Sequence, residues 1–300
     1  MFKLRNYYEF SKVFRQLFYF SQNSNRRFNQ AILGAWGYTE ENGPNRWAKL
    51  SESYVLSDEG KRQSPIMIDT GLTIFNKNTN IKLDKLDTLM TGSLKNTGQS
   101  IKYEPNSDTP VPLVEAKVDF PGLVLCNPFR LAEFHFHWGS SNEEGSEHVI
   151  DGKPGCGEIH FVYANTKYEG AKIAVRHADG LIVLGYMLSV GENSVFDELF
   201  KFMPEIKASN DRVENVTFKI SQFFQDKQTQ GGFYVYQGSL TTPPCYESVT
   251  WFLSPLPLVI TQEQLRVLRS QRVDEHTQLQ QNFRPLKPLN GRKVLRISCK

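Results

Sequence analysis

Apolar and polar residues alternate in short segments over most of the chain, and Gly, Asn, Asp and Pro separate these segments. Alternation with a period of two is typical of strands that bury one face. The pattern predicts strands over residues 131–138, 158–163, 181–190 and 233–236. We therefore expect a domain dominated by strands.

Helical signals are confined to two short segments. Residues 194–202 begin with Ser194, a residue type that can cap a helix, and their apolar residues are three to four positions apart. Residues 261–269 begin with Thr261, and Gln264 follows three positions later, which is the capping-box pattern. Both segments predict short helices at the periphery of the sheet.

The first 33 residues differ in composition from the rest, because they combine many Phe and Tyr with several Lys and Arg and a single acid, Glu9. Their longest apolar run, residues 17–20, is shorter than the roughly 7–15 residues of a secretory signal. We expect an N-terminal extension of a cytoplasmic protein. A mitochondrial transit peptide, which is also basic and poor in acids, is the alternative. One folded domain is expected over residues 34–297, with a short tail at 298–300.

Composition and charge exclude several classes of protein. The formal net charge is only +3, and no basic cluster is interleaved with aromatic residues, so nucleic acid is not an expected partner. No run of 18 apolar residues occurs, which argues against a membrane-spanning helix. The four cysteines are scattered, and we expect them as reduced, packed thiols.

The first predicted strand carries a candidate metal site. Alternation places Glu133, His135 and His137 on one face, while the aromatic residues between and after them lie on the other face and anchor the strand in a core. Two imidazoles two residues apart on a strand could bind one metal ion. Ordinary strands also contain such histidine pairs, whose side chains then only make hydrogen bonds.

The second predicted strand repeats the pattern with Glu158 and His160 on one face, after a gap long enough for a return beside the first strand. Three neutral histidines with one open position are typical of catalytic zinc, whereas structural zinc has four protein ligands. A carboxylate on the same face that accepts the second ring N–H would fix the tautomer of a ligand histidine.

Residues 239–244, Ser-Leu-Thr-Thr-Pro-Pro, form a third candidate segment. Its paired prolines stiffen the backbone and could hold a Thr hydroxyl in place, although an ordinary rigid turn has the same sequence features. Together with residues 134–139 (FHFHWG), 145–148 (GSEH) and 158–160 (EIH), this segment resembles the signatures of α-class carbonic anhydrases, in the same order and at matching intervals. The resemblance extends over about residues 35–297.

The resemblance implies a fold and an activity. The fold is a single, mainly β domain with peripheral helices, in which a large twisted, mostly antiparallel sheet holds zinc in a conical cleft. The activity is the reversible, zinc-dependent hydration of carbon dioxide to bicarbonate and a proton. The expected small-molecule partners of the protein are therefore CO2, water and bicarbonate. Carbonic anhydrase is itself the standard example of zinc lowering the pKa of its bound water to about 7.

The resemblance also implies roles for individual residues. The zinc ligands are His135, His137 and His160, and the residues that contact them are Glu133, Glu158 and Asn282. Ionised Glu147 can only accept a hydrogen bond, so Thr241 donates to it and accepts from the zinc-bound hydroxide. The substrate pocket comprises Val162, Val183, Leu240, Thr242, Val249 and Trp251.

Three positions depart from the family pattern. Gln99 stands where the family usually has its proton-shuttle histidine, which predicts an enzyme with weakened proton transfer. Glu133 stands where a glutamine usually contacts the first zinc ligand, so it adds a negative charge. Cys245 stands where secreted relatives have half of a disulfide, but residues 49–62 contain no partner cysteine.

Two other functions are compatible with the same fold. Carbonic-anhydrase-related proteins act as binding or scaffold modules and have lost one or more zinc histidines, whereas all three are present here. Hydrolysis of small esters is a plausible side activity of the same site.

Overall fold

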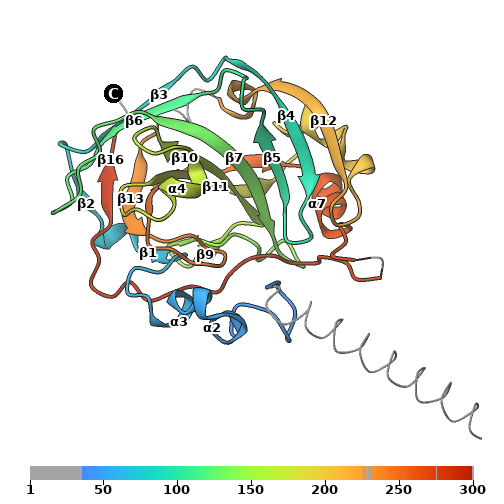
Figure 1. Cartoon of the computed structure of the whole chain (residues 1–300), viewed down its shortest axis with the longest axis horizontal. Coiled ribbons are helices and arrows are strands. Elements are labelled where there is room, and N and C mark those ends of the chain that lie inside the picture. The colour runs from blue at the N-terminus through green and yellow to red at the C-terminus, as the bar shows by residue number, and fades with distance from the viewer. Residues whose placement is uncertain (1–35, 226–227, 229–230, 275, 299–300) are drawn as a thin grey trace, which may run out of the picture.

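The computed structural model describes residues 36–298 except 226, 227, 229, 230 and 275 (Figure 1). The expected extension over residues 1–33 lies outside the described residues, as do the last two residues of the expected tail. Cys126, Cys156 and Cys245 are free; Cys156 and Cys245 are buried, as expected, whereas Cys126 is exposed, and Cys299 is outside the described part of the chain.

The described residues form one curved sheet of 13 strands that dominates the molecule (Figure 1). Its central order is β12-β4-β5-β7-β10-β11-β14-β13-β16-β2, with β3, β6 and β15 paired beside this path. The strands are β2 (Ile74–Phe75), β3 (Asn80–Asp84), β4 (Leu89–Asn96), β5 (Ile101–Pro105), β6 (Leu113–Lys117), β7 (Phe129–Trp138), β10 (Gly157–Asn165), β11 (Leu181–Val190), β12 (Arg212–Lys219), β13 (Phe233–Gly238), β14 (Val249–Leu253), β15 (Leu258–Ile260) and β16 (Leu295–Ile297).

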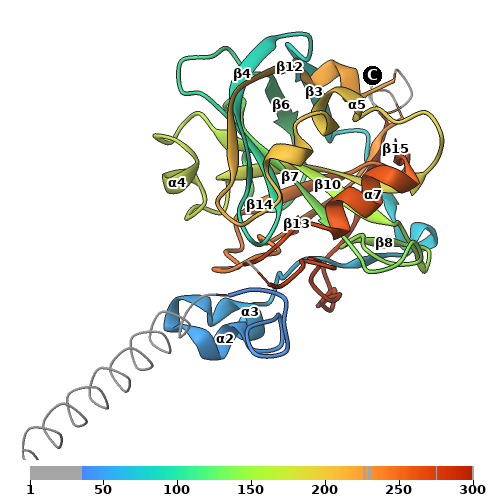
Figure 2. The same ribbon diagram turned by 90° about the vertical axis from the view of Figure 1, so that its right-hand side faces the viewer.

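Short elements surround this sheet. A small second sheet contains β1 (Met67–Ile68), β8 (Val149–Ile150) and β9 (Lys153–Pro154). The helices and 3-10 turns are α2 (Trp47–Leu50), η1 (Glu52–Tyr54), α3 (Leu56–Glu59), η2 (Thr70–Leu72), α4 (Ala171–Ala174), α5 (Asp197–Phe200), η3 (Met203–Glu205), η4 (Ile220–Phe223) and α7 (Gln262–Arg269). Two perpendicular views place α2 and α3 together at one end of the molecule (Figures 1 and 2).

The expected fold class is confirmed. All four predicted strands are present, and β11 has the predicted bounds. Most neighbouring strands are antiparallel, while β11 pairs in parallel with β14 and β15, and β16 with β2. The predicted capping box of α7 is also present: the Thr261 side chain accepts from the Gln264 N–H, and the Gln264 side chain accepts from the Thr261 N–H.

The helix predicted over residues 194–202 is wrong in length and in its cap. The structure has only the single turn α5, whose N-cap is Phe196. The Ser194 hydroxyl instead accepts from the Phe196 N–H in a tight turn and donates to Gln264 Oε1. After α5 the chain forms the separate 3-10 turn η3, in which Pro204 lies at the start. The apolar spacing thus reflects burial against the core and not a continuous helix.

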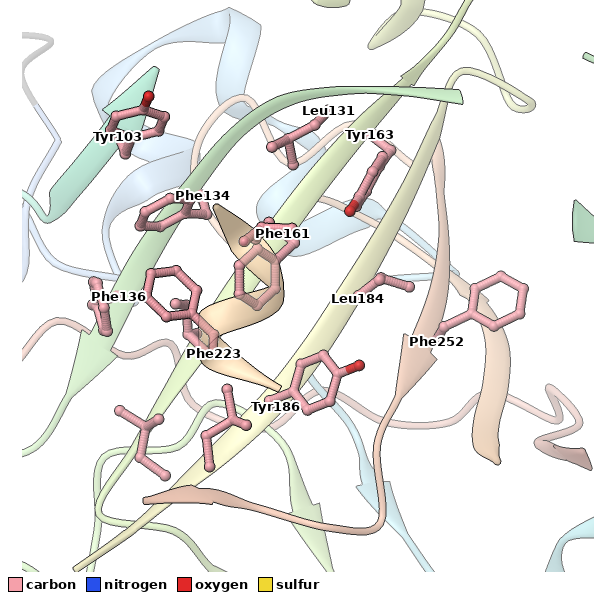
Figure 3. Packing of buried hydrophobic residues seen from close by; sticks show 14 of the residues in the cluster. Tyr103, Leu131, Phe134, Phe136, Phe161, Tyr163, Leu184, Tyr186, Phe223 and Phe252 are labelled. Carbon is pink, nitrogen blue, oxygen red and sulfur yellow. The ribbon is translucent and has the colours of Figure 1, made fainter. Parts of the chain in front are cut away.

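The two faces of β7, β10 and β11 bury different kinds of side chain. One face packs into the main hydrophobic core, where the rings of Phe134 and Phe161 contact Phe223 of η4 and Tyr186 contacts Phe161 (Figure 3). The other face carries the histidines, and Val183 on this face belongs to a smaller apolar cluster. The central strands therefore form a rigid wall between the main core and the candidate site.

Phe134 is a central residue of the main core. Its side chain is fully buried, and its ring contacts those of Tyr103, Phe136, Phe161 and Phe218. We predict that Phe134→Ala lowers the free energy of unfolding by about 3–5 kcal/mol, since it leaves a cavity in a packed core.

Urea denaturation followed by circular dichroism measures this change. The control is Leu89→Ala at the start of β4, where the side chain is 57% exposed and the loss should stay within about 0.5 kcal/mol. Equal losses in the two variants would contradict the assignment of Phe134 to the core.

Candidate metal centre

Backbone pairing between β7 and β10 brings the candidate histidines together. The strands are antiparallel, with His160 opposite His135 and Glu158 opposite His137. The predicted return strand is thus confirmed, and candidate ligand atoms of the three histidines all lie within 4.8 Å of one another.

Each of the three rings has one nitrogen held by an acceptor outside the cluster. His135 Nδ1 lies 2.9 Å from Glu133 Oε1, and His160 Nε2 lies 2.7 Å from Glu158 Oε1. His137 Nδ1 lies 2.8 Å from the backbone carbonyl oxygen of Asn282. Because carboxylate and carbonyl oxygens only accept, these ring nitrogens carry the protons. The remaining nitrogens, His135 Nε2, His160 Nδ1 and His137 Nε2, have free lone pairs.

The arrangement of these lone pairs fits a cation. His160 Nδ1 and His135 Nε2 are 3.3 Å apart with no proton between them, and the buried His137 Nε2 has no hydrogen-bond partner among the described residues. A buried nitrogen without a partner is costly, and a metal ion would satisfy all three at once. Neutral imidazoles of this number and kind are the ligands that catalytic zinc takes.

The electrostatics of the site favour the neutral form of the His137 and His160 imidazoles. Burial lowers the pKa of His137 well below its usual value, and burial lowers that of His160 to about 4 although the Glu158 carboxylate opposes the shift. Burial would raise the pKa of Glu158, but His148 and His160 outweigh it and hold that pKa well below the usual range. Neutral histidines beside a charged carboxylate are the forms that metal ligation requires.

Glu158 is held from three directions. Besides His160, it accepts from the backbone N–H of His148 at 2.8 Å and from His148 Nδ1 at 2.7 Å. His148 Nε2 in turn lies 2.6 Å from the hydroxyl oxygen of Tyr236, so His148 is a buried hydrogen-bonding residue. His148, Glu158 and His160 also lie close enough to suit a metal, but their facing atoms already bond one another.

The loop after β7 carries Glu147 to the metal side of the wall. Gly145 has φ +138°, and a Cβ there would collide with the backbone of Gly139 and Cys156, so only glycine fits this close approach. Glu147 Oε1 accepts from the Arg284 N–H, and Oε2 lies 3.4 Å from His137 Nε2. Burial raises the pKa of Glu147 well above its usual value, while the hydrogen bond of the Thr241 side chain opposes the rise.

A cavity of about 510 Å³ opens over the histidines. Besides all three rings, it is lined by most of the residues expected at the site: Gln99, Glu133, Val162, Val183, Leu240, Thr241, Thr242 and Trp251. Val249 is buried in the apolar cluster of Val183 and Trp251 but does not itself line the cavity. Glu147, Glu158 and Asn282 are buried around the cavity and not on its lining.

The sequence interpretation missed several residues that support the site. The Tyr236 hydroxyl donates a hydrogen bond to the Ser64 hydroxyl. Because Tyr236 also contacts His148, this bond links His148 to the segment of Ser64, which precedes β1. Buried Arg284 donates to Gln63 Oε1 and to the carbonyl oxygens of Ser64 and Ser57. The sequence signal that could have found Arg284 is its place two residues after the expected contact residue Asn282.

Comparison with known proteins agrees with this geometry. The family model for eukaryotic-type carbonic anhydrase matches residues 42–298. The chain belongs to the eukaryotic-type carbonic anhydrase family. It is 34% identical to carbonic anhydrase 7 of Homo sapiens over 271 residues, covering 86% of this chain and 96% of the relative. It is 33% identical to carbonic anhydrase 1 of Mus musculus over 267 residues (86% and 97%) and 31% identical to carbonic anhydrase 3 of Bos taurus over 266 residues (86% and 96%).

Within the described part of this carbonic anhydrase chain, none of the helices has the length and apolar character needed to cross a lipid bilayer.

Asn282 holds the segment that orients His137, and its side chain makes three hydrogen bonds. Its Oδ1 accepts from the Trp138 N–H, and its Nδ2 donates to the carbonyl oxygens of Gln99 and Phe136. We predict that Asn282→Ala lowers the free energy of unfolding by about 2–4 kcal/mol, because it leaves buried backbone groups without partners.

Urea denaturation of the metal-free protein checks this value. The matched control is Gln281→Ala, which alters an exposed neighbour and should leave stability unchanged. An unaltered free energy of unfolding in the Asn282 variant would show that these bonds do not hold the segment.

Proposed function

We propose that this protein catalyses the zinc-dependent, reversible hydration of CO2 to bicarbonate and a proton. The observation that carries the proposal is the set of three ring nitrogens, one from each histidine, that lie within 4.8 Å of one another at a cavity, while their opposite nitrogens are held by Glu133, Glu158 and Asn282. His135, His137 and His160 would hold the metal. Zinc bound there supplies a Lewis acid that makes a water molecule nucleophilic near neutral pH.

Glu147 and Thr241 would orient the attacking water. A cation held by the histidines lowers the pKa of the nearby Glu147 carboxyl, since an opposite charge favours the ionised form. Ionised Glu147 accepts only, so the Thr241 hydroxyl donates to it. The Thr241 oxygen is then free to accept a hydrogen bond from the water, which would fix the direction of the water's remaining lone pairs. Thr242, next in the loop, would contact bicarbonate or a bridging water.

The apolar wall beside the histidines suits CO2, because CO2 is uncharged and binds to an apolar surface without having to displace tightly bound water. Val162, Val183, Leu240 and Trp251 line this part of the cavity, and Trp251 and Val183 are only 2% exposed overall. Val249 would support this wall from behind, because it is buried in the same cluster. A site that binds CO2 without ordering water around it leaves the nucleophile unobstructed.

Proton export would be the slow part of the cycle. Gln99 lines the cavity at the shuttle position, and its side chain donates to the Trp36 carbonyl oxygen at 3.4 Å. An amide does not titrate near neutral pH. Tyr38 also lines the cavity, but burial and the charge of Glu147 raise its pKa well above the usual value, which makes it a poor substitute.

Loss of a metal ligand tests the activity and the site together. We predict that the protein binds one equivalent of zinc and hydrates CO2, and that His137→Ala abolishes both. Metal analysis and stopped-flow CO2 hydration measure the two properties. The control is His177→Ala, which alters an exposed histidine remote from the cluster and should preserve both.

Full activity in the His137 variant would refute the assigned site. Stoichiometric zinc without any CO2 hydration would instead support a binding or scaffold role.

The proton step gives a separate prediction. Gln99→His should raise kcat severalfold in dilute buffer and leave kcat/KM nearly unchanged, because the latter reports the CO2 step and not proton export. Imidazole added to the unaltered protein should have the same effect. Gln99→Asn, which adds no titrating group, is the control. A kcat that is already fast and independent of buffer would show that another group carries the proton.

A further inference from the structure

A row of four alternating charges crosses one wall of the cavity toward the candidate metal centre. Lys95 on β4 lies 2.5 Å from Glu104 on β5, measured from Nζ to Oε2. Lys102 Nζ lies 3.9 Å from Glu104 Oε1 and 3.7 Å from Glu133 Oε2 on β7. Glu133 then contacts the ring of His135, so the row ends on a proposed metal ligand.

The sheet register fixes this row. Lys95 is paired across the strands with Lys102, and Lys102 is paired with His135. Cross-strand neighbours on one face lie about 4.5–5.5 Å apart at their Cβ atoms, which is within reach of long charged side chains. Because Glu104 is held closely by Lys95, Lys102 is left as the cation that faces Glu133.

Glu133 is a charged neighbour of the metal centre. Both of its carboxylate oxygens lie within 3.0 Å of His135 Nδ1, and its side chain is only 15% exposed. On its other side the Lys102 ammonium lies 3.7 Å from Glu133 Oε2, so the carboxylate pairs with a cation as well as with the His135 ring. Its negative charge lies in a partly desolvated place, where salt screens charges less than on an open surface.

We propose that Lys102 balances the negative charge that Glu133 brings to the metal centre and thereby sets the affinity of the centre for zinc. The inference rests on the zinc site proposed above. In this arrangement Glu133 strengthens zinc binding, because it accepts from His135 and adds negative charge near a cation. Lys102 opposes that effect with a positive charge of its own. Lys102 thus acts on the metal by its own charge, beside Glu133 and without contacting a proposed ligand.

The proposal gives opposite signs for the two partners. Glu133→Gln removes the negative charge and should weaken zinc binding by about tenfold, the lower end of what loss of such a contact costs. Lys102→Met removes the positive charge and should tighten zinc binding by about two- to fivefold, a smaller change because Lys102 lies farther from the ligands and is 30% exposed.

A purely structural role for Lys102 predicts the reverse sign. If Lys102 only held Glu133 in place, its loss would loosen the contact to His135 and weaken zinc binding. The double variant separates the two accounts further. Charge balance places its zinc dissociation constant between those of Glu133→Gln and the unaltered protein, whereas a structural role makes it equal to that of Glu133→Gln.

The experiment measures zinc dissociation constants of the full chain by competition with a chromogenic chelator at fixed pH and ionic strength. The control is Lys95→Met, which removes an equal charge from the same row but contacts Glu104 and not Glu133. Its zinc affinity should stay within about twofold of the unaltered protein. Lys102→Arg keeps the charge and should also keep the affinity.

Thermal unfolding of each metal-free variant shows that it is folded, and Lys102→Gln replaces Lys102→Met if the latter is not. Weaker or unchanged zinc binding in the folded Lys102 variant would overturn the inference while leaving the proposed function intact. Failure of the unaltered protein to bind zinc at all would refute the proposed function itself.

Discussion

The pairing of β7 with β10 is the constraint on which the rest of the site depends. The antiparallel register puts His160 opposite His135 and Glu158 opposite His137. A slip of one residue would turn the imidazoles of one strand into the main core, because side chains alternate between the two faces. The aromatic residues on the core face prevent such a slip, since it would drive them into the polar cleft. The hydrophobic core thus determines where the metal ligands lie.

Burial then decides the chemistry of the groups on the cleft face. Glu158 remains charged although it is fully buried, because His148 and His160 surround it with donors. Glu147 lies nearby with an equally buried carboxyl, but fewer donors reach it and its pKa is raised. In the absence of a metal ion, the pKa values of two carboxyl groups in one desolvated region are therefore shifted in opposite directions, as hydrogen bonding to the charged form favours that form.

Local patterns predicted the parts of the structure that depend on local periodicity. The period of two placed Glu133, His135 and His137 on one face of a strand, and the capping box located α7. The same reasoning predicted too long a helix over residues 194–202, because the apolar residues there are spaced as in a helix although they are buried by tertiary packing. The hydrogen-bond acceptor for His137 could not be predicted from residue types, because it is the backbone carbonyl oxygen of Asn282 and every residue has a backbone carbonyl. Val249 shows a further limit, as sequence does not distinguish a residue on a cavity wall from one just behind it.

The contact between His137 and Asn282 also bears on how the protein is made. The two residues are 145 positions apart, so the ring that β7 provides stays without its acceptor until a much later part of the chain has been synthesised. Contacts of such long sequence separation form late, because the entropy of closing the intervening loop must be met first. The His137 ring can therefore meet its acceptor only after the chain has been synthesised as far as Asn282. A chain that has been synthesised only as far as β14 can therefore bury its aromatic residues while His137 still lacks the acceptor that orients its ring.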